Sequence, residues 1–140
     1  MANTDTDLNV ATFVTDWLSF EPASRVGGER HFAASSQLAL QEFSEPFVGW
    51  LLIGLLAAST SSPRLLASLG AGPLEDLLSH HPHRFVPLAA SEARLNAGIR
   101  SALRSTLLCH HEVPEALLER LEAAVPGFVR LPECGCEAGV

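Results

Sequence analysis

The stretch from Gly70 to His81, with the sequence GAGPLEDLLSHH, constrains the fold more than any other part of the chain. Gly70 follows a leucine-rich run, and glycine is the residue that most often ends a helix. The Gly-Pro pair that comes next is typical of a helix start, and three leucines then recur at helical spacing. The stretch therefore predicts two helices that meet at a tight corner, with Glu75 and Asp76 in the first turn of the second helix.

Serine, proline and glycine mark further helix ends along the chain. Ser44 is expected to cap a helix with Pro46 in its first turn, and Ser62 to cap the next helix. The run 47–58 is apolar almost all round, which is typical of a helix in the middle of a bundle. Leu38 and Phe43 are expected on the inner face of the helix before it. The pattern predicts helices at about 5–20, 33–43, 47–58, 63–69, 73–79, 96–109 and 114–125, loops or turns at 21–30 and 79–84, and a short helix or turn at 85–93.

No run of alternating polar and apolar residues long enough for a strand is present. Leu and Ala dominate and Tyr is absent, which favours helices over sheets. We therefore expect an all-α fold: a compact bundle of about six or seven short helices with no significant sheet. Residues 1–127 are expected to form a single helical domain, and 128–140 an irregular C-terminal tail.

The charge balance and the cysteines limit the classes of partner and compartment. Nine basic residues, all arginine, stand against sixteen acidic ones, and the net charge of −7 argues against direct nucleic-acid binding. The longest apolar run, 47–58, is shorter than the roughly 20 residues that span a bilayer, so we expect no membrane contact. Three cysteines are an odd number, and the acidic N-terminus lacks a basic leader region. These features favour a cytoplasmic protein.

The segment 65–100 resembles a bacterial family of uncharacterised helical domains. The hallmark of that family is an Ala/Gly-Gly-Pro-Leu-Glu-Asp-Leu-Leu core followed by a histidine, and here the core stands at 70–78 with His80 or His81 in the histidine position. Trp17 and Trp50 are similar to tryptophans of the same family, although this chain has Glu45-Pro46 where the family has Pro-Glu. The resemblance implies a helical fold and implies no activity.

The corner that carries this core is the expected contact surface for a partner. Glu75 and Asp76 complement the positive end of a helix, which is the simpler explanation of both carboxylates. Because the corner also holds them rigidly beside the histidine turn, we expect Glu75, Asp76, His80 and His81 to form an interaction surface. Adjacent residues diverge by about 100° around a helix, so Glu75 and Asp76 are poorly placed to share one metal ion or one proton.

A metal site is the alternative that the histidines and cysteines suggest. Imidazole and thiolate groups are the usual ligands of zinc, but the spacing Cys-x-Cys is a poor match to structural zinc knuckles. The candidate ligands are His80, His81, His83, Cys109, His110, Cys134 and Cys136. Without this site, the histidines would be exposed residues at a helix end and Cys109 a packing residue.

The nucleotide-binding, zinc-protease and serine-hydrolase motifs GxGxxG, GxxxxGK[ST], HExxH and GxSxG do not occur in the sequence. We therefore expect a non-enzymatic protein without a cofactor that binds a partner protein, as immunity, inhibitor or regulatory proteins do. A homodimer is a further option. Zinc binding is the main alternative, and a small hydrolase of unrecognised type is the weakest.

Overall fold

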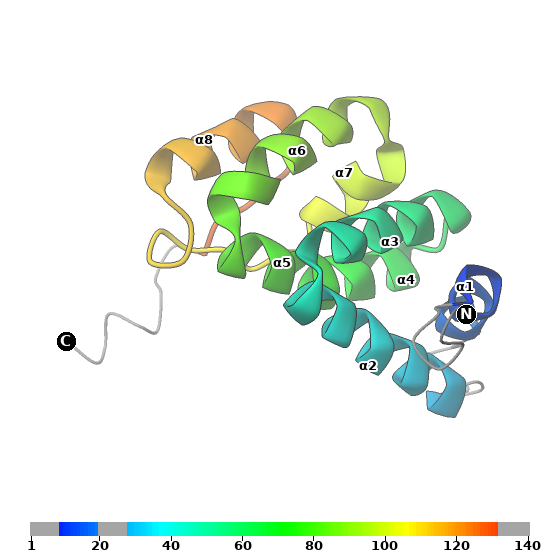
Figure 1. Cartoon of the computed structure of the whole chain (residues 1–140). Helices are drawn as coiled ribbons and strands as arrows, with labels where there is room; N and C mark the ends of the chain where they lie inside the picture. The colour runs from blue at the N-terminus through cyan, green and yellow to red at the C-terminus, as the bar shows by residue number, and fades with distance from the viewer. Residues whose placement is uncertain (1–8, 20–27, 132–140) are drawn as a thin grey trace.

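The computed structural model describes residues 9–19 and 28–131, and in these ranges it contains helices and no strand (Figure 1). The all-α fold without a sheet is therefore confirmed. Elements α4, η1 and α5 follow one another without a break, so the described ranges form seven helical runs. The elements are α1 (Val10–Leu18), α2 (Gly28–Ser44), α3 (Pro46–Ser59), α4 (Pro63–Leu69), η1 (Gly70–Leu74), α5 (Glu75–His80), α6 (Pro82–Leu95), α7 (Ala97–Leu103) and α8 (Glu115–Ala124).

The helices pack around one continuous core. Helix α2 lies between α1 and α3, α7 packs on α3, α4 and α6, and α8 covers α6. In Figure 1, α2 and α6 lie on opposite sides of α3. The largest side chains in the core are fully buried, and each such burial stabilises the fold by roughly 1.5–3 kcal/mol. They include Trp17, Leu38, Ile53, Leu69, Leu78, Phe85, Ile99 and Leu103.

The glycine-proline corner is a π-helical turn, and the prediction that Gly70 ends one helix and Pro73 starts another is wrong. The backbone N–H of Glu75 donates to the carbonyl of Gly70, five residues back. A proline inside an α-helix clashes with the carbonyl four residues earlier, and the wider π turn relieves this conflict. Gly70 serves close packing instead, because a Cβ there would overlap the carbonyl oxygen of Ala102 in α7.

Helix α3 begins without the serine cap that the sequence suggests. Ser44 is the last residue of α2, and its hydroxyl donates to the Leu40 carbonyl at 2.8 Å. Glu45 takes the N-cap position without a side-chain hydrogen bond, and Pro46 follows it in the first turn. The predicted cap role of Ser44 is therefore wrong, while the position of Pro46 is confirmed.

Only one side of α3 is buried, so the expectation that it is surrounded by the bundle is wrong. Ile53 and Leu56 have no exposed surface, whereas Phe47, Leu51 and Leu55 are 45%, 55% and 39% exposed. The exposed residues recur every fourth position and therefore form one outward stripe. Within the described ranges this stripe lies on the surface.

Helices α6 and α7 differ from the predicted lengths. Pro82 opens α6, where a missing N–H costs nothing, so the helix includes three residues of the expected turn. Helix α7 is capped by Asn96, whose side chain accepts from the Ile99 N–H at 3.1 Å, and it ends at Leu103 instead of near 109. A helix continuing to 109 would place Leu107 on the same buried face as Ile99 and Leu103. Because the helix ends at Leu103, Leu107 is instead more than half exposed.

The boundaries of the described ranges differ from those expected. Asn9 caps α1, and the residues that the sequence suggests as caps of the first helix, Thr4 or Asp5, lie outside the described residues. Residues 28–30 are helical, not part of a loop. Residues 128–131 pack on the domain, since Phe128 is buried and the Leu131 N–H donates to the Leu108 carbonyl at 2.8 Å.

Candidate functional site

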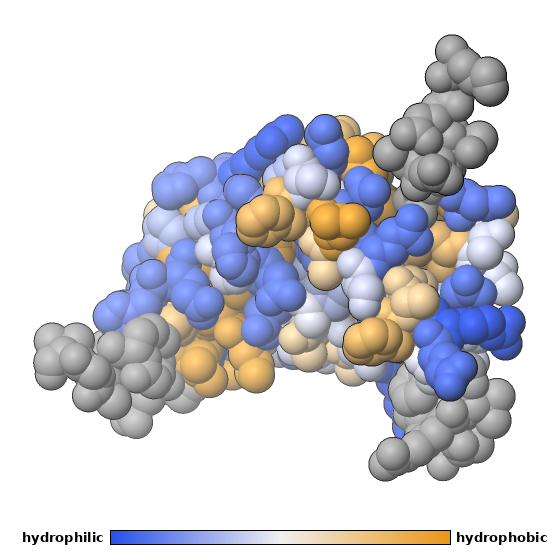
Figure 2. Space-filling view, turned by 60° about the horizontal axis from the view of Figure 1, so that its bottom comes forward, coloured by the Kyte–Doolittle hydropathy of each residue, from blue (hydrophilic) through white to orange (hydrophobic). Residues whose placement is uncertain are grey.

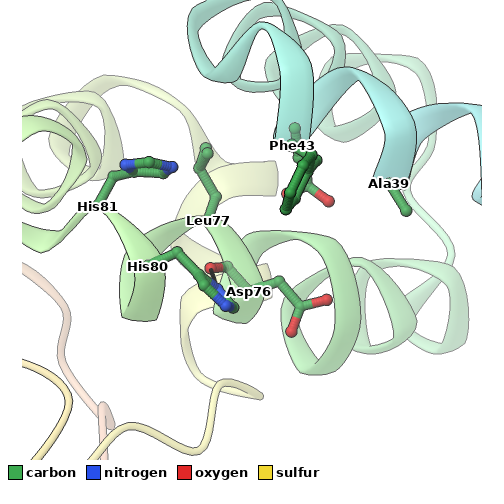
Figure 3. A pocket seen from close by; sticks show the side chains of 7 residues that line it. Ala39, Phe43, Asp76, Leu77, His80 and His81 are labelled. Atoms are coloured by element: carbon green, nitrogen blue, oxygen red, sulfur yellow. Dashed lines mark hydrogen bonds between the residues drawn. The ribbon is translucent and has the colours of Figure 1, made fainter.

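A pocket of about 390 Å³ lies between α2 and α5. This volume falls within the range of roughly 300–1,000 Å³ that is usual for ligand sites. Figure 3 shows Phe43 reaching from α2 toward α5, where Leu77 rises toward it and Asp76 and His80 lie next to each other. The pocket is lined by Ala39, Glu42, Phe43, Asp76, Leu77, His80 and His81.

Three of the four residues predicted for the contact surface line this pocket from α5 and its end. The Nδ1–H of His80 donates to the backbone carbonyl of Asp76 at 2.7 Å, so that histidine is held against its own helix. His81 follows at the helix end, and its ring meets Phe85 edge-on with centroids 6.1 Å apart. Asp76 is exposed, and its carboxylate is accessible from solvent.

Glu75, the fourth predicted residue, belongs to a different contact. Its Oε1 accepts a hydrogen bond of 2.6 Å from the backbone N–H of Leu107, and it does not line the pocket. Burial raises the pKa of Glu75, the bond from Leu107 opposes that rise, and the negative charges of Asp76 and Glu112 add to it. Glu75 therefore ties the segment after α7 to α5, and Asp76 alone of the carboxylate pair faces the pocket.

The α2 side of the pocket contributes a buried glutamate that the sequence analysis missed. Glu42 is only 7% exposed, and its Oε2 is fully buried and has no hydrogen-bond partner in the part of the chain that the structure describes. Its side chain lies against α3 where glycine leaves room, since a Cβ on Gly49 would come within 2.7 Å of the Glu42 Cγ. Glu42 follows Ala34 and Leu38 at four-residue intervals on the buried stripe of α2, and this position was the available signal.

Burial changes the ionisation of this carboxyl group. Loss of hydration raises the pKa of Glu42 to about 8, and the negative charge of Asp76 contributes to the rise. At neutral pH the group is therefore mostly protonated and can donate a hydrogen bond. A cation that entered the pocket would favour its ionised form.

Phe43 forms the exposed wall of the pocket. It is 89% exposed, so the prediction that it faces the core is wrong, whereas Leu38 is fully buried as predicted. Leu40, on the same helix, is also largely exposed. Next along the chain, Phe47 in the first turn of α3 contacts Arg84 of α6, with 5.8 Å between the guanidinium carbon and the ring centroid. Figure 2 shows that apolar side chains on one face of the molecule gather in several separate patches among polar ones.

The structure does not assemble the predicted metal ligands within the ranges it describes. In residues 9–19 and 28–131, no three histidine, cysteine, aspartate or glutamate side chains form a group that could hold a metal ion. Cys109 is buried and its thiol donates to Glu112 at 3.6 Å, and the rings of His110 and His111 lie 4.3 Å apart at a tilt of 36°. Cys134 and Cys136 lie outside the described residues, so zinc binding through the tail stays a prediction.

The described part of the chain defines an all-α domain with a pocket at one helix corner. The protein belongs to a family of unknown function (DUF6869), which matches residues 26–127. The match covers α2 to α8 and therefore every residue of the pocket. Membership in an uncharacterised family, expected from the resemblance, is thus confirmed.

Neither the curated proteins nor the solved structures include a match to this chain. Among the helices that the structure describes, none has the length and apolar character needed to cross a bilayer. Function must therefore be argued from the pocket and its surroundings.

Proposed function

We propose that this protein acts by binding a partner protein, and that the contact surface is centred on the pocket between α2 and α5. The observation that carries this proposal is Phe43, a large aromatic side chain that is 89% exposed at the rim of a cavity. Aromatic residues beside a pocket dominate the free energy of many protein interfaces, because they bury a large rigid surface on contact.

The composition of the surrounding surface supports the same function. Leu40 on α2 adds apolar area, while Asp76 and His80 supply polar groups at the edge of the cavity. An apolar centre with a polar rim is the usual anatomy of a non-obligate interface. The expected role is that of a cytoplasmic, non-enzymatic bacterial protein that inhibits, neutralises or regulates its partner.

The test uses two variants of the full chain that remove equally exposed apolar side chains. Phe43→Ser removes the proposed anchor. Leu95→Ser is the matched control, because Leu95 is 87% exposed at the end of α6, and α6 lies across α3 from α2 in Figure 1. A photo-crosslinking residue at position 43 first identifies the partner in the native cell, and the partner is then purified.

Binding of the purified partner is measured by calorimetry. We expect Phe43→Ser to weaken binding by about 30-fold, the effect of losing a residue worth roughly 2 kcal/mol, and Leu95→Ser to leave it unchanged. A partner that binds wild type and Phe43→Ser with the same affinity would show that this surface is not the contact site.

A further inference from the structure

The carboxyl group of Glu42 is an unsatisfied polar group inside the fold. Its Oε2 is fully buried and makes no hydrogen bond within residues 9–19 and 28–131, although Glu42 lines an open cavity. Buried polar atoms are almost always paired, because an unpaired one loses its hydration without compensation. Among the residues that the structure describes, this oxygen has no partner, so a donor that enters the cavity can supply the missing hydrogen bond.

The chemistry of the cavity indicates what that partner is. Two of the seven lining residues, Glu42 and Asp76, are carboxyl groups, and none is an arginine. The exposed ring of Phe43 and the side chain of Leu77 supply flat apolar walls. A planar cation matches this set, since its edge can bond carboxylate oxygens while its face stacks on an aromatic ring.

We propose that the pocket receives an arginine side chain of the partner protein. The inference rests on the proposed function and adds the chemistry of the occupant. A guanidinium carries five N–H donors, so it can bond to Glu42 and Asp76 together while it stacks on Phe43.

The same geometry occurs elsewhere in the chain, where the guanidinium carbon of Arg84 lies 5.8 and 5.2 Å from the ring centroids of Phe47 and Phe85. The net charge of −7 favours encounter with a basic partner surface. Arginine is also enriched in interfaces, where lysine is depleted.

Binding changes the protonation of Glu42. When the guanidinium enters, the carboxylic acid of Glu42 loses its proton to solvent and the carboxylate that forms pairs with the cation. The other titratable side chains that line the pocket are Asp76 and His80 of α5 and His81 at its C-terminal end, and α3 and η1 contain no titratable side chain.

The experiment titrates the isotope-labelled full chain with small blocked amino acids and follows backbone amide signals by NMR. The probe is N-acetyl-arginine amide. N-acetyl-citrulline amide has nearly the same shape without the charge, and N-acetyl-lysine amide has the charge without the planar fork. We expect the arginine probe to shift signals from residues 39–43 and 76–81 and to saturate at about millimolar concentration, as befits one side chain without the rest of an interface.

Variants then assign the effect to the carboxyl groups. Glu42→Gln and Asp76→Asn should each weaken the arginine probe by about fivefold or more, because each removes a charged acceptor. Glu119→Gln, the same change at an exposed position of α8, should leave binding unchanged.

Three outcomes would overturn the proposal. An arginine probe that shifts no pocket signal excludes the ligand, and equal shifts by the citrulline probe mean that shape and not charge is recognised. A protein that is dimeric by sedimentation, and that the arginine probe dissociates, would place an arginine of a second copy in the pocket.

If the arginine probe does not bind while Phe43→Ser still abolishes partner binding, only the proposed occupant of the pocket is wrong. If the probe binds but Phe43→Ser leaves partner binding intact, the pocket accepts arginine but is not the contact surface for the partner.

Discussion

Replacement of Glu42 by glutamine should remove a specific pH dependence from the stability of the fold. The pKa of Glu42 rises from 4.5 to about 8 because the group is buried and faces the charge of Asp76. Between these two values the folded protein keeps a proton that the unfolded chain releases. The contribution of Glu42 to stability is therefore fully present below about pH 4.5 and is lost as the pH rises through about 8.

The size of the effect follows from one proton. One pKa unit corresponds to about 1.36 kcal/mol, so two pH units inside this window change the free energy of unfolding by at most about 2.7 kcal/mol. We expect the free energy of unfolding of wild type, relative to Glu42→Gln, to fall by about 1–2 kcal/mol from pH 5 to pH 7.

The measurement is urea unfolding of wild type and Glu42→Gln at pH 5, 6 and 7, followed by the fluorescence of the buried Trp17 and the partly buried Trp50. All other side chains are the same in both proteins, so the difference between the two stability curves reports on Glu42. Glu119→Gln serves as the control for loss of one exposed carboxylate. Parallel stability curves for wild type and Glu42→Gln would refute the conclusion that this carboxyl group is held protonated inside the fold.

Four further changes test individual contacts of the structure. Gly70→Ala should destabilise the fold by about 1–3 kcal/mol in thermal unfolding, because the new methyl group overlaps Ala102. Gly72→Ala, with open space around it, should be neutral or slightly stabilising, and equal effects of the two changes would contradict the close approach of η1 and α7. Glu75→Ala should cost about 1 kcal/mol in urea unfolding and speed amide exchange at Leu107, whose N–H loses its acceptor; unchanged exchange would count against this contact. Asn96→Ala should cost about 1 kcal/mol and Asn96→Asp much less, because aspartate keeps the cap; a similar loss in both would argue against the cap. Elemental analysis of the full chain, purified without a histidine tag, should find substoichiometric zinc, and one zinc per chain would instead support a site that includes Cys134 and Cys136.

Local signals were enough to predict the helical class and several helix ends. Pro63 with its Ser62 cap, Pro46 in the first turn and the final helix after Pro114 all follow from side chains that act within a few residues. The exposed and buried sides of α3 could not be predicted in this way, because nearly every position of that helix is apolar. Its packing partners decide which side is covered.

The π turn and the pocket depend on residues far apart in the sequence. A glycine and a proline three positions apart occur both where a helix ends and in a π turn, so the local sequence does not distinguish the two. Glycine is required at position 70 because the backbone of Ala102, in another helix, lies against it. Glu42 is buried because α3 packs against it at Gly49, so its burial follows from the fold and not from any motif. Asp76, His80 and His81 were predicted because they lie together in the chain.

The most direct test of the contact surface is hydrogen exchange of the protein with and without its purified partner. Amides of residues 39–43 in α2 and 76–81 in α5 should exchange more slowly in the complex, because the partner covers both sides of the pocket. The exposed end of α6 around Leu95 should exchange at the same rate in both states. Protection confined to α6 and α8, with no change along the pocket, would contradict the assignment.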